Sequence, residues 1–191
     1  RGLYEHINLI VLADHGMAAV PVAHVVLIDR TIPEDAVQTV SLGVLAGFNP
    51  KAGRERDFAA IERKLEQPQQ HMRCWDKTRI PARLHYGSHP RVPQLVCLAD
   101  VGWRVASDAY LAYKRTHGQP LSRGEHGYDN DEPLMRALFV AHGPAFMQGA
   151  VVPAFPNVDV YPLMAHLLGV PPAANDGHYE DVRGMLKPAV R

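Results

Sequence analysis

The chain lacks the features that mark several protein classes. It has only two cysteines, Cys74 and Cys97, whose spacing fits neither a zinc ribbon nor a disulfide-rich scaffold and leaves a single bridge between them open. No run approaches the roughly 18 apolar residues of a membrane-spanning helix, and the first residues contain neither the basic nor the apolar region of a signal peptide. Basic and acidic residues balance at 20 each, which disfavours long nucleic acids and acidic membranes as partners. What remains is a globular chain of 191 residues with enough apolar residues, 47%, to build a core.

The most informative segment is an apolar run, residues 8–13, that stops at Asp14, His15 and Gly16. A run without polar alternation predicts a buried parallel strand, and in such sheets the chemistry lies beyond the carboxyl ends of the strands. Asp14 and His15 suit a divalent cation there, and Gly16 would let the backbone turn away without crowding it. The alternative is that Asp14 caps a turn and His15 packs at the sheet edge.

A second candidate ligand is His126, which lies between glycines in a loop before the apolar segment 135–141. Zinc binds carboxylate oxygen and imidazole nitrogen in tetrahedral geometry, so Asp14, His15 and His126 make a plausible partial shell. A tetrahedral catalytic site needs about three protein ligands and a water, so a dinuclear site would require ligands from elsewhere. Next to His126, Tyr128 and Asp129 either orient its ring or form a simple turn.

The rest of the chain predicts an α/β fold. Residues 8–13 and 135–141 are expected as parallel strands of one main sheet, with a mostly β excursion over approximately residues 31–120. Apolar spacings of three and four predict a helix over residues 54–67, and a capped amphipathic pattern predicts another over residues 157–169. Residues 94–99 and 103–106 suggest a hairpin, residues 114–130 a polar loop, and the tail beyond Pro171 a surface segment. His142 is expected to pack structurally, although it follows a strand as His15 does.

Five blocks occur in order along nearly the whole chain. They are Leu12–Met17, Leu84–Arg91, Gly124–Asn130, Met135–Phe146, and Asn157–Tyr161 with Asn175–Gly177. Together they resemble the C-terminal half of the nucleotide pyrophosphatase/phosphodiesterase family, the type I phosphodiesterases of the alkaline phosphatase superfamily, and bacterial members in particular. The resemblance implies part of an alkaline-phosphatase-like three-layer sandwich with a mainly parallel sheet. Residues 1–191 would then be the C-terminal part of one catalytic domain.

The resemblance also implies a two-zinc site. By position, Asp14 and His15 would bind one zinc ion and His126 the other. The remaining ligands and the threonine nucleophile of the family belong to an N-terminal half that this chain does not include. We therefore expect the chain to supply about half of the zinc ligands and no catalytic nucleophile. Without that half, apolar sheet surface would be left exposed.

The function implied is hydrolysis of nucleotide phosphodiester or pyrophosphate bonds, releasing nucleoside monophosphate. The substrate would be a nucleotide-type small molecule, and the isolated chain would be inactive. One alternative keeps the scaffold and metals but acts on lipid-type or other esters; another is a noncatalytic metal-binding fragment. The family favours a periplasmic or extracellular location, which nothing in these 191 residues tests.

Overall fold

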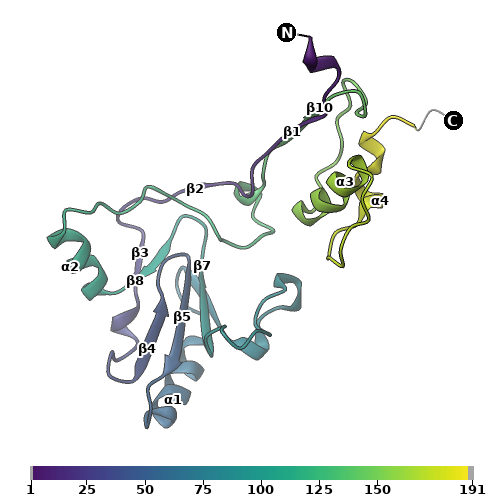
Figure 1. The fold of residues 1–191 in the computed structure, drawn as a ribbon. Helices are drawn as coiled ribbons and strands as arrows, with labels where there is room; N and C mark the ends of the chain where they lie inside the picture. Colours follow the sequence, from purple (N-terminus) through teal and green to yellow (C-terminus); the bar gives the residue numbers. More distant parts are fainter. Residues whose placement is uncertain (1, 189–191) are drawn as a thin grey trace. The chain divides into compact units, whose positions relative to one another are not determined.

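The computed structural model describes residues 2–188 and divides the chain into two compact units. Unit 1 combines the segment that ends at His15 with the segment that begins at Ala137, and unit 2 is the intervening segment Gly16–Arg136 (Figure 1). Helices and both parallel and antiparallel strand pairs are present, which confirms the α/β class. Within residues 2–188, none of the helices combines the length and the apolar character that crossing a bilayer requires.

Unit 2 is built around a four-stranded antiparallel sheet in the order β4-β5-β7-β6. The bounds of its strands are β4 Val37–Ser41, β5 Leu45–Pro50, β6 Met72–Asp76 and β7 Leu95–Ala99. Two smaller pairs join β3 (Val25–Leu27) to β8 (Arg104–Ala106) in parallel and β2 (Ala18–Ala19) to β9 (Gly124–Glu125) in antiparallel sense. The first part of the segment 71–93 forms β6, which pairs with β7.

Helix α1, Glu55–Leu65, packs on this sheet and follows the predicted helix closely. Phe58, Ile61 and Leu65 are spaced by three and four residues, so they share one face and are buried in the core of unit 2. Acidic residues in the first turn and basic residues in the last complement the helix dipole. Burial of each large apolar side chain contributes about 1.5–3 kcal/mol. The apolar face of α1 therefore holds it against the sheet.

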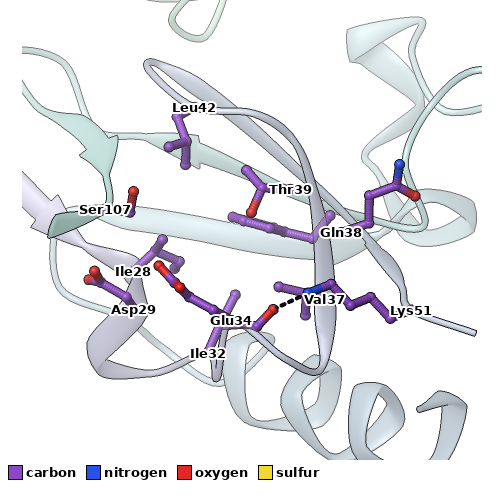
Figure 2. A pocket seen from close by; sticks show the side chains of 11 residues that line it. Ile28, Asp29, Ile32, Glu34, Val37, Gln38, Thr39, Leu42, Lys51 and Ser107 are labelled. Carbon is purple, nitrogen blue, oxygen red and sulfur yellow. Dashed lines mark hydrogen bonds between the residues drawn. The ribbon is translucent and has the colours of Figure 1, made fainter. Parts of the chain in front are cut away.

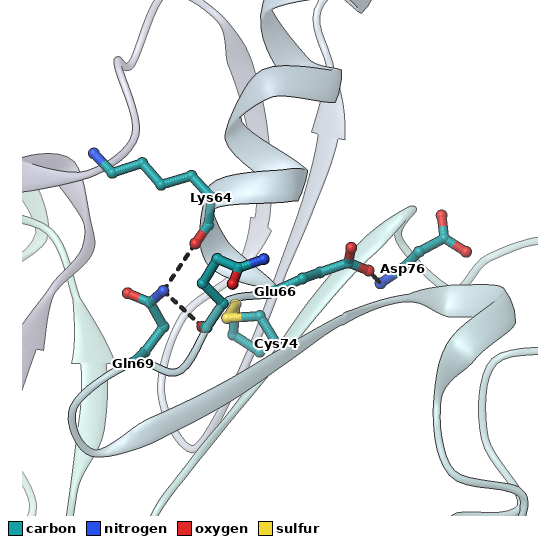
Figure 3. Close-up of a disulfide and its surroundings, with 7 residues drawn as sticks. Lys64, Glu66, Gln69, Cys74 and Asp76 are labelled. Carbon is teal, nitrogen blue, oxygen red and sulfur yellow. Dashed lines mark hydrogen bonds between the residues drawn. A yellow bond between two sulfur atoms is a disulfide. The ribbon is translucent and has the colours of Figure 1, made fainter.

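A disulfide joins Cys74 of β6 to Cys97 of β7, two residues that face each other in the strand register. Figure 3 shows this bridge beside the end of α1, where Gln69 Nε2 donates to the carbonyl of Lys64 and the backbone amide of Asp76 donates to Glu66 Oε1. The bridge links the outer strand β6 covalently to the sheet interior. The structure therefore contains the single bridge that the sequence allowed but did not predict.

Two predictions for unit 2 are wrong. Strands β7 and β8 do not form a hairpin, because β5 and β6 already occupy both edges of β7 and β8 pairs with β3 instead. The expected polar loop begins as a helix, α2 (Asp108–Thr116), capped by the Ser107 hydroxyl, which accepts from the Tyr110 amide at 3.0 Å. None of its residues is buried, so no buried apolar stripe marks this helix.

Unit 1 contains the two strands that were expected to be parallel neighbours, but their direction is different. β1 (Leu9–Leu12) and β10 (Phe139–His142) pair in antiparallel sense, with Leu9 opposite His142 and Leu12 opposite Phe139. The prediction of parallel pairing rested on an apolar run without alternation, which is typical of strands buried on both faces. An apolar run predicts burial of a strand but does not determine the direction of its neighbour, so the strand was predicted correctly and its direction was not. β1 is largely exposed.

Two helices complete unit 1, namely α3 (Val160–Leu167) and α4 (Tyr179–Val182). α3 extends the single 3-10 turn at 157–159 and ends before Gly169, as predicted. Asp159 does not cap it, because its Oδ1 accepts instead from the amide of His178 at 2.8 Å. The tail was expected at the surface, yet Val182 and Met185 are buried in the small core of this unit.

We predict that loss of the Cys74–Cys97 bridge lowers the free energy of unfolding by about 3 kcal/mol, because the bridge restricts an unfolded loop of 23 residues. The measurement is urea denaturation of the protein and of the double variant Cys74→Ala/Cys97→Ala. Reductant serves as the control, since it should destabilise the parent protein and leave the variant unchanged. Equal stabilities of the oxidised parent and the variant would contradict the prediction.

Candidate metal centre

Asp14 and His15 come directly after β1, and their side chains converge. His15 Nε2 lies 3.4 Å from Asp14 Oδ2. Two ligands of one tetrahedral zinc ion, each about 2.0–2.2 Å from the metal, are about 3.3–3.5 Å apart. The Asp14 side chain is 85% exposed and the His15 side chain 35%, so both side chains are accessible from solvent. The pair therefore has the donor chemistry and the separation of one edge of a zinc site.

Backbone contacts within unit 1 fix this pair in place. The amide of Ala13 donates to the carbonyl of Leu138, and Asn157 Nδ2 donates to the carbonyl of Asp14 at 3.2 Å. The amide of His15 donates to Asp14 Oδ1 at 3.0 Å, which restrains the carboxylate itself. Asn157 thus anchors the backbone at the first candidate ligand.

Gly16 is required for a different reason from the one expected. A Cβ atom at this position would lie 2.0 Å from the carbonyl oxygen of Leu134 and 2.8 Å from that of Arg136. The amide of Gly16 also donates to the carbonyl of Met135 at 2.9 Å. The residue after the Asp-His pair must therefore be glycine because another backbone segment passes against it.

His126 belongs to unit 2 and follows β9 in a loop whose neighbours on both sides are held. Before it, Glu125 Oε1 lies 3.0 Å from Nη1 of Arg104, a side chain that is almost wholly buried. After it, the Tyr128 hydroxyl donates to the carbonyl of Trp103 at 2.9 Å. Between them Gly127 has a φ of +88°, a conformation that favours glycine. The loop carrying His126 is thus pinned at residues 125 and 128.

Asp129 supplies a third attachment through an ion pair with Arg83. Arg83 Nη1 donates to Asp129 Oδ1 at 2.7 Å and Nη2 to Oδ2 at 2.5 Å, so the pair is bidentate. Arg73 Nη2 lies 3.5 Å from the same carboxylate. The hydrogen bonds from Arg83 lower the pKa of Asp129 to about 2. Asp129 is therefore an anion over nearly the whole pH range and keeps the loop attached to Arg83.

The three predicted ligands divide between the units: Asp14 and His15 belong to unit 1 and His126 to unit 2. Among residues 2–188, no group of three His, Cys, Asp or Glu side chains gathers closely enough to hold a metal ion. Asp14 and His15 alone fit half of a tetrahedral shell. His142 stacks on Tyr4 with ring centroids 4.1 Å apart, in line with the packing role expected for it.

Sequence reasoning missed the two arginines that hold the His126 loop. Arg83 lies 46 residues before Asp129, and Arg104 lies 21 residues before Glu125, so no local spacing connects them. The one available signal for Arg83 was its position next to the block Leu84–Arg91. Both residues act on the neighbours of His126.

A cavity of about 400 Å³ lies elsewhere in unit 2, beside β4 (Figure 2). Apolar side chains such as Ile28, Ile32 and Phe48 line it together with Glu34, whose carbonyl accepts from Lys51 Nζ at 2.7 Å. Neither the Asp-His pair nor His126 contributes to its lining. This cavity is therefore separate from the candidate ligands.

Comparison with known proteins finds phosphodiesterases and nucleotide pyrophosphatases among the relatives of this chain. The family model for type I phosphodiesterase / nucleotide pyrophosphatase matches residues 1–129. The bis(5'-adenosyl)-triphosphatase ENPP4 of Bos taurus is 32% identical over 185 residues, which cover 97% of this chain and 38% of that protein. The venom phosphodiesterase of Naja atra is 32% identical over 197 residues, which cover 98% of this chain and 22% of that protein.

Solved structures of nucleotide pyrophosphatase / phosphodiesterase proteins also resemble this chain. Human ectonucleotide pyrophosphatase / phosphodiesterase 5 matches with a TM-score of 0.85 and 27% identity, covering 97% of this chain and 47% of that one. An inactive variant of the murine protein in complex with AMP also matches with a TM-score of 0.85, at 30% identity, covering 97% of this chain and 46% of that one. This chain therefore spans less than half the length of these relatives.

We predict a pH-dependent contribution of Asp129 to stability. The folded-state pKa, about 2, lies below the ordinary value of 3.8, so folding favours the carboxylate. The stabilisation is then fully present above about pH 4 and is lost as the pH falls towards 2. Urea denaturation should show Asp129→Asn less stable than the parent at pH 7, with the difference disappearing near pH 2. A difference that stayed constant with pH would contradict this assignment.

The control is Asp57→Asn, which removes an exposed ion pair with Arg54 at 2.9 Å. Exposed pairs of this kind contribute about 0–1 kcal/mol, so this variant should stay close to the parent at every pH.

Proposed function

The chain belongs to the type I phosphodiesterase / nucleotide pyrophosphatase family, and we propose that the complete polypeptide hydrolyses nucleotide phosphodiester or pyrophosphate bonds and releases nucleoside monophosphate. The observation that carries this proposal is the family match over residues 1–129, because it includes all three candidate ligands, Asp14, His15 and His126. Two relatives are named for related activities, a bis(5'-adenosyl)-triphosphatase and a phosphodiesterase. The complex of the murine relative with AMP supports a nucleoside monophosphate as the product.

We further propose that Asp14 and His15 hold one zinc ion and His126 holds a second. The 3.4 Å separation of Asp14 Oδ2 and His15 Nε2 supports the first assignment. When bound, two zinc ions polarise a phosphoryl group and lower the pKa of an attacking hydroxyl. The carboxylate of Asp14 would offset part of the cationic charge, and neutral imidazoles would fix ligand geometry without adding charge.

The remaining ligands and the threonine that attacks phosphorus are proposed to lie in an N-terminal half of the same protein. Unit 1 offers a surface for this N-terminal half, because several apolar side chains of β1, of β10 and of the residue just before β10 are exposed. These are Leu9, Val11, Leu12, Leu138 and Val140, with exposed fractions of 40–58%. Exposed apolar surface of this extent on neighbouring strands marks an interaction site.

We predict that Asp14→Asn, His15→Gln and His126→Gln in the complete polypeptide each lower the rate of diester hydrolysis more than ~100-fold. Changes outside the ligand shell already cost about 10- to 100-fold, and a ligand matters more. The measurements are release of nucleoside monophosphate from a dinucleoside polyphosphate and bound zinc by elemental analysis. A lipid-type phosphodiester tested in parallel distinguishes the main alternative substrate.

The matched control is His117→Gln, which replaces an exposed histidine that stacks on Tyr113 in α2. It should retain both zinc and activity. Tight zinc binding without turnover by the complete polypeptide would exclude the enzymatic proposal and favour a noncatalytic metal-binding role. Full activity in Asp14→Asn would exclude the ligand assignment.

We also predict that the 191-residue chain on its own self-associates through the exposed strands of unit 1, while the complete polypeptide does so much less. Light scattering and size-exclusion chromatography at several concentrations provide the test. The charged variant Val11→Lys, on the exposed side of β1, should reduce association of the short chain. A monomeric short chain with a cooperative melting transition would contradict this expectation.

A further inference from the structure

Arg83 makes an unusually concentrated set of contacts with the segment that follows His126. Its guanidinium binds Asp129 in bidentate fashion, and Nη1 also lies 3.0 Å from Asp131 Oδ2 and 3.3 Å from Asn130 Oδ1. Three consecutive side chains are thus gathered by one planar group. A lysine cannot reproduce this arrangement, because its ammonium is a point charge without the fork geometry of arginine.

The segment needs such an attachment because of its backbone. Gly127, immediately after His126, has nothing within 4 Å of the position of a Cβ atom and a φ of +88°. Glycine has more conformational freedom than any other residue, so this position is a natural joint in the loop. The contacts on its far side, made by Tyr128 and Asp129, therefore determine how the loop is held.

Side chains hold the backbone on both sides of His126. On the near side Arg104 is buried, contacts Glu125 and donates to the carbonyl of Ser122 at 2.5 Å. On the far side Tyr128 makes one neutral hydrogen bond to the carbonyl of Trp103, whereas Asp129 makes charged, bidentate bonds to Arg83. Charged hydrogen bonds are roughly twice as strong as neutral ones. Arg83 is therefore the charged anchor after the glycine joint, and it acts beside the buried ring of Tyr128.

We propose that Arg83 is a positioning residue for His126: it holds the 127–131 segment so that the imidazole is presented to the metal in one orientation. This inference rests on the proposed function, which assigns a zinc ion to His126. Arg83 acts through Asp129 and is not itself a ligand. The low pKa of Asp129 agrees with this role, because the anchor stays charged throughout the pH range in which the enzyme would work.

The test compares Arg83→Met and Arg83→Lys with the parent in the complete polypeptide. Zinc affinity is measured by competition with a chromophoric chelator, and kcat and KM are measured on a dinucleoside polyphosphate. We expect Arg83→Met to weaken binding of the zinc assigned to His126 ~10- to 100-fold and to lower kcat with little change in KM. Arg83→Lys keeps the charge but not the fork, so it should recover only part of the loss.

Hydrogen exchange of the metal-free protein gives a readout that needs no zinc. The amides of residues 127–131 should exchange faster in Arg83→Met, and those of β9 should not. The matched control is Arg79→Met, at a position close to Arg83 in the chain. It removes another arginine–carboxylate pair, in which Arg79 Nη2 lies 2.5 Å from Glu66 Oε1. This control should leave zinc affinity, kcat and exchange of residues 127–131 unchanged.

The outcomes separate the two proposals. Parent-like zinc affinity, kcat and exchange in Arg83→Met, with an active zinc-bound parent, would overturn the role of Arg83 and leave the proposed function intact. A lower melting temperature with parent-like zinc affinity would likewise overturn it, since Arg83 would then only stabilise the fold. A parent that neither binds zinc nor hydrolyses the substrate would overturn the proposed function, and the positioning role with it.

Discussion

The antiparallel pairing of β1 with β10 is the interaction on which the organisation of the chain depends. It places Leu9 opposite His142, so residues from the two ends of the chain form unit 1 and the segment Gly16–Arg136 is an insertion between them. The Asp14-His15 pair directly follows β1 and is held by hydrogen bonds from Ala13 and Asn157 within the same unit. The position of the first two candidate ligands is therefore a consequence of long-range strand pairing.

Local patterns predicted the elements whose signal is local. The spacing of Phe58, Ile61 and Leu65 gave α1 nearly to its ends, and the pattern before Gly169 gave α3. Strand pairing was predicted less well, because direction and neighbours depend on residues far apart in sequence. The parallel assignment of β1 and β10 and the hairpin of β7 with β8 failed for this reason. Helix α2 was missed because it buries no apolar residue.

In the candidate site too, residues in short motifs were predicted from the sequence and residues that act over long separations were not. Asp14, His15 and His126 were found from short motifs, since a ligand pair after a strand and a histidine between glycines are visible in sequence. The side chains that hold the His126 loop were not, because Arg83 and Arg104 reach it from other parts of unit 2. Gly16 was identified from its place after the Asp-His pair, and the structure adds a reason that the sequence does not show, a backbone segment against it. Short motifs thus predict candidate ligands, and the supporting contacts require the fold.

The central claim is that Asp14 and His15 bind one zinc ion and His126 a second. The most direct test is a crystal structure of the complete polypeptide with anomalous diffraction recorded on both sides of the zinc absorption edge. We expect two zinc peaks, one within about 2.0–2.2 Å of a carboxylate oxygen of Asp14 and a ring nitrogen of His15, and one at a similar distance from a ring nitrogen of His126. Fully occupied zinc bound by other residues, or no zinc at these three side chains in zinc-saturated protein, would contradict the account.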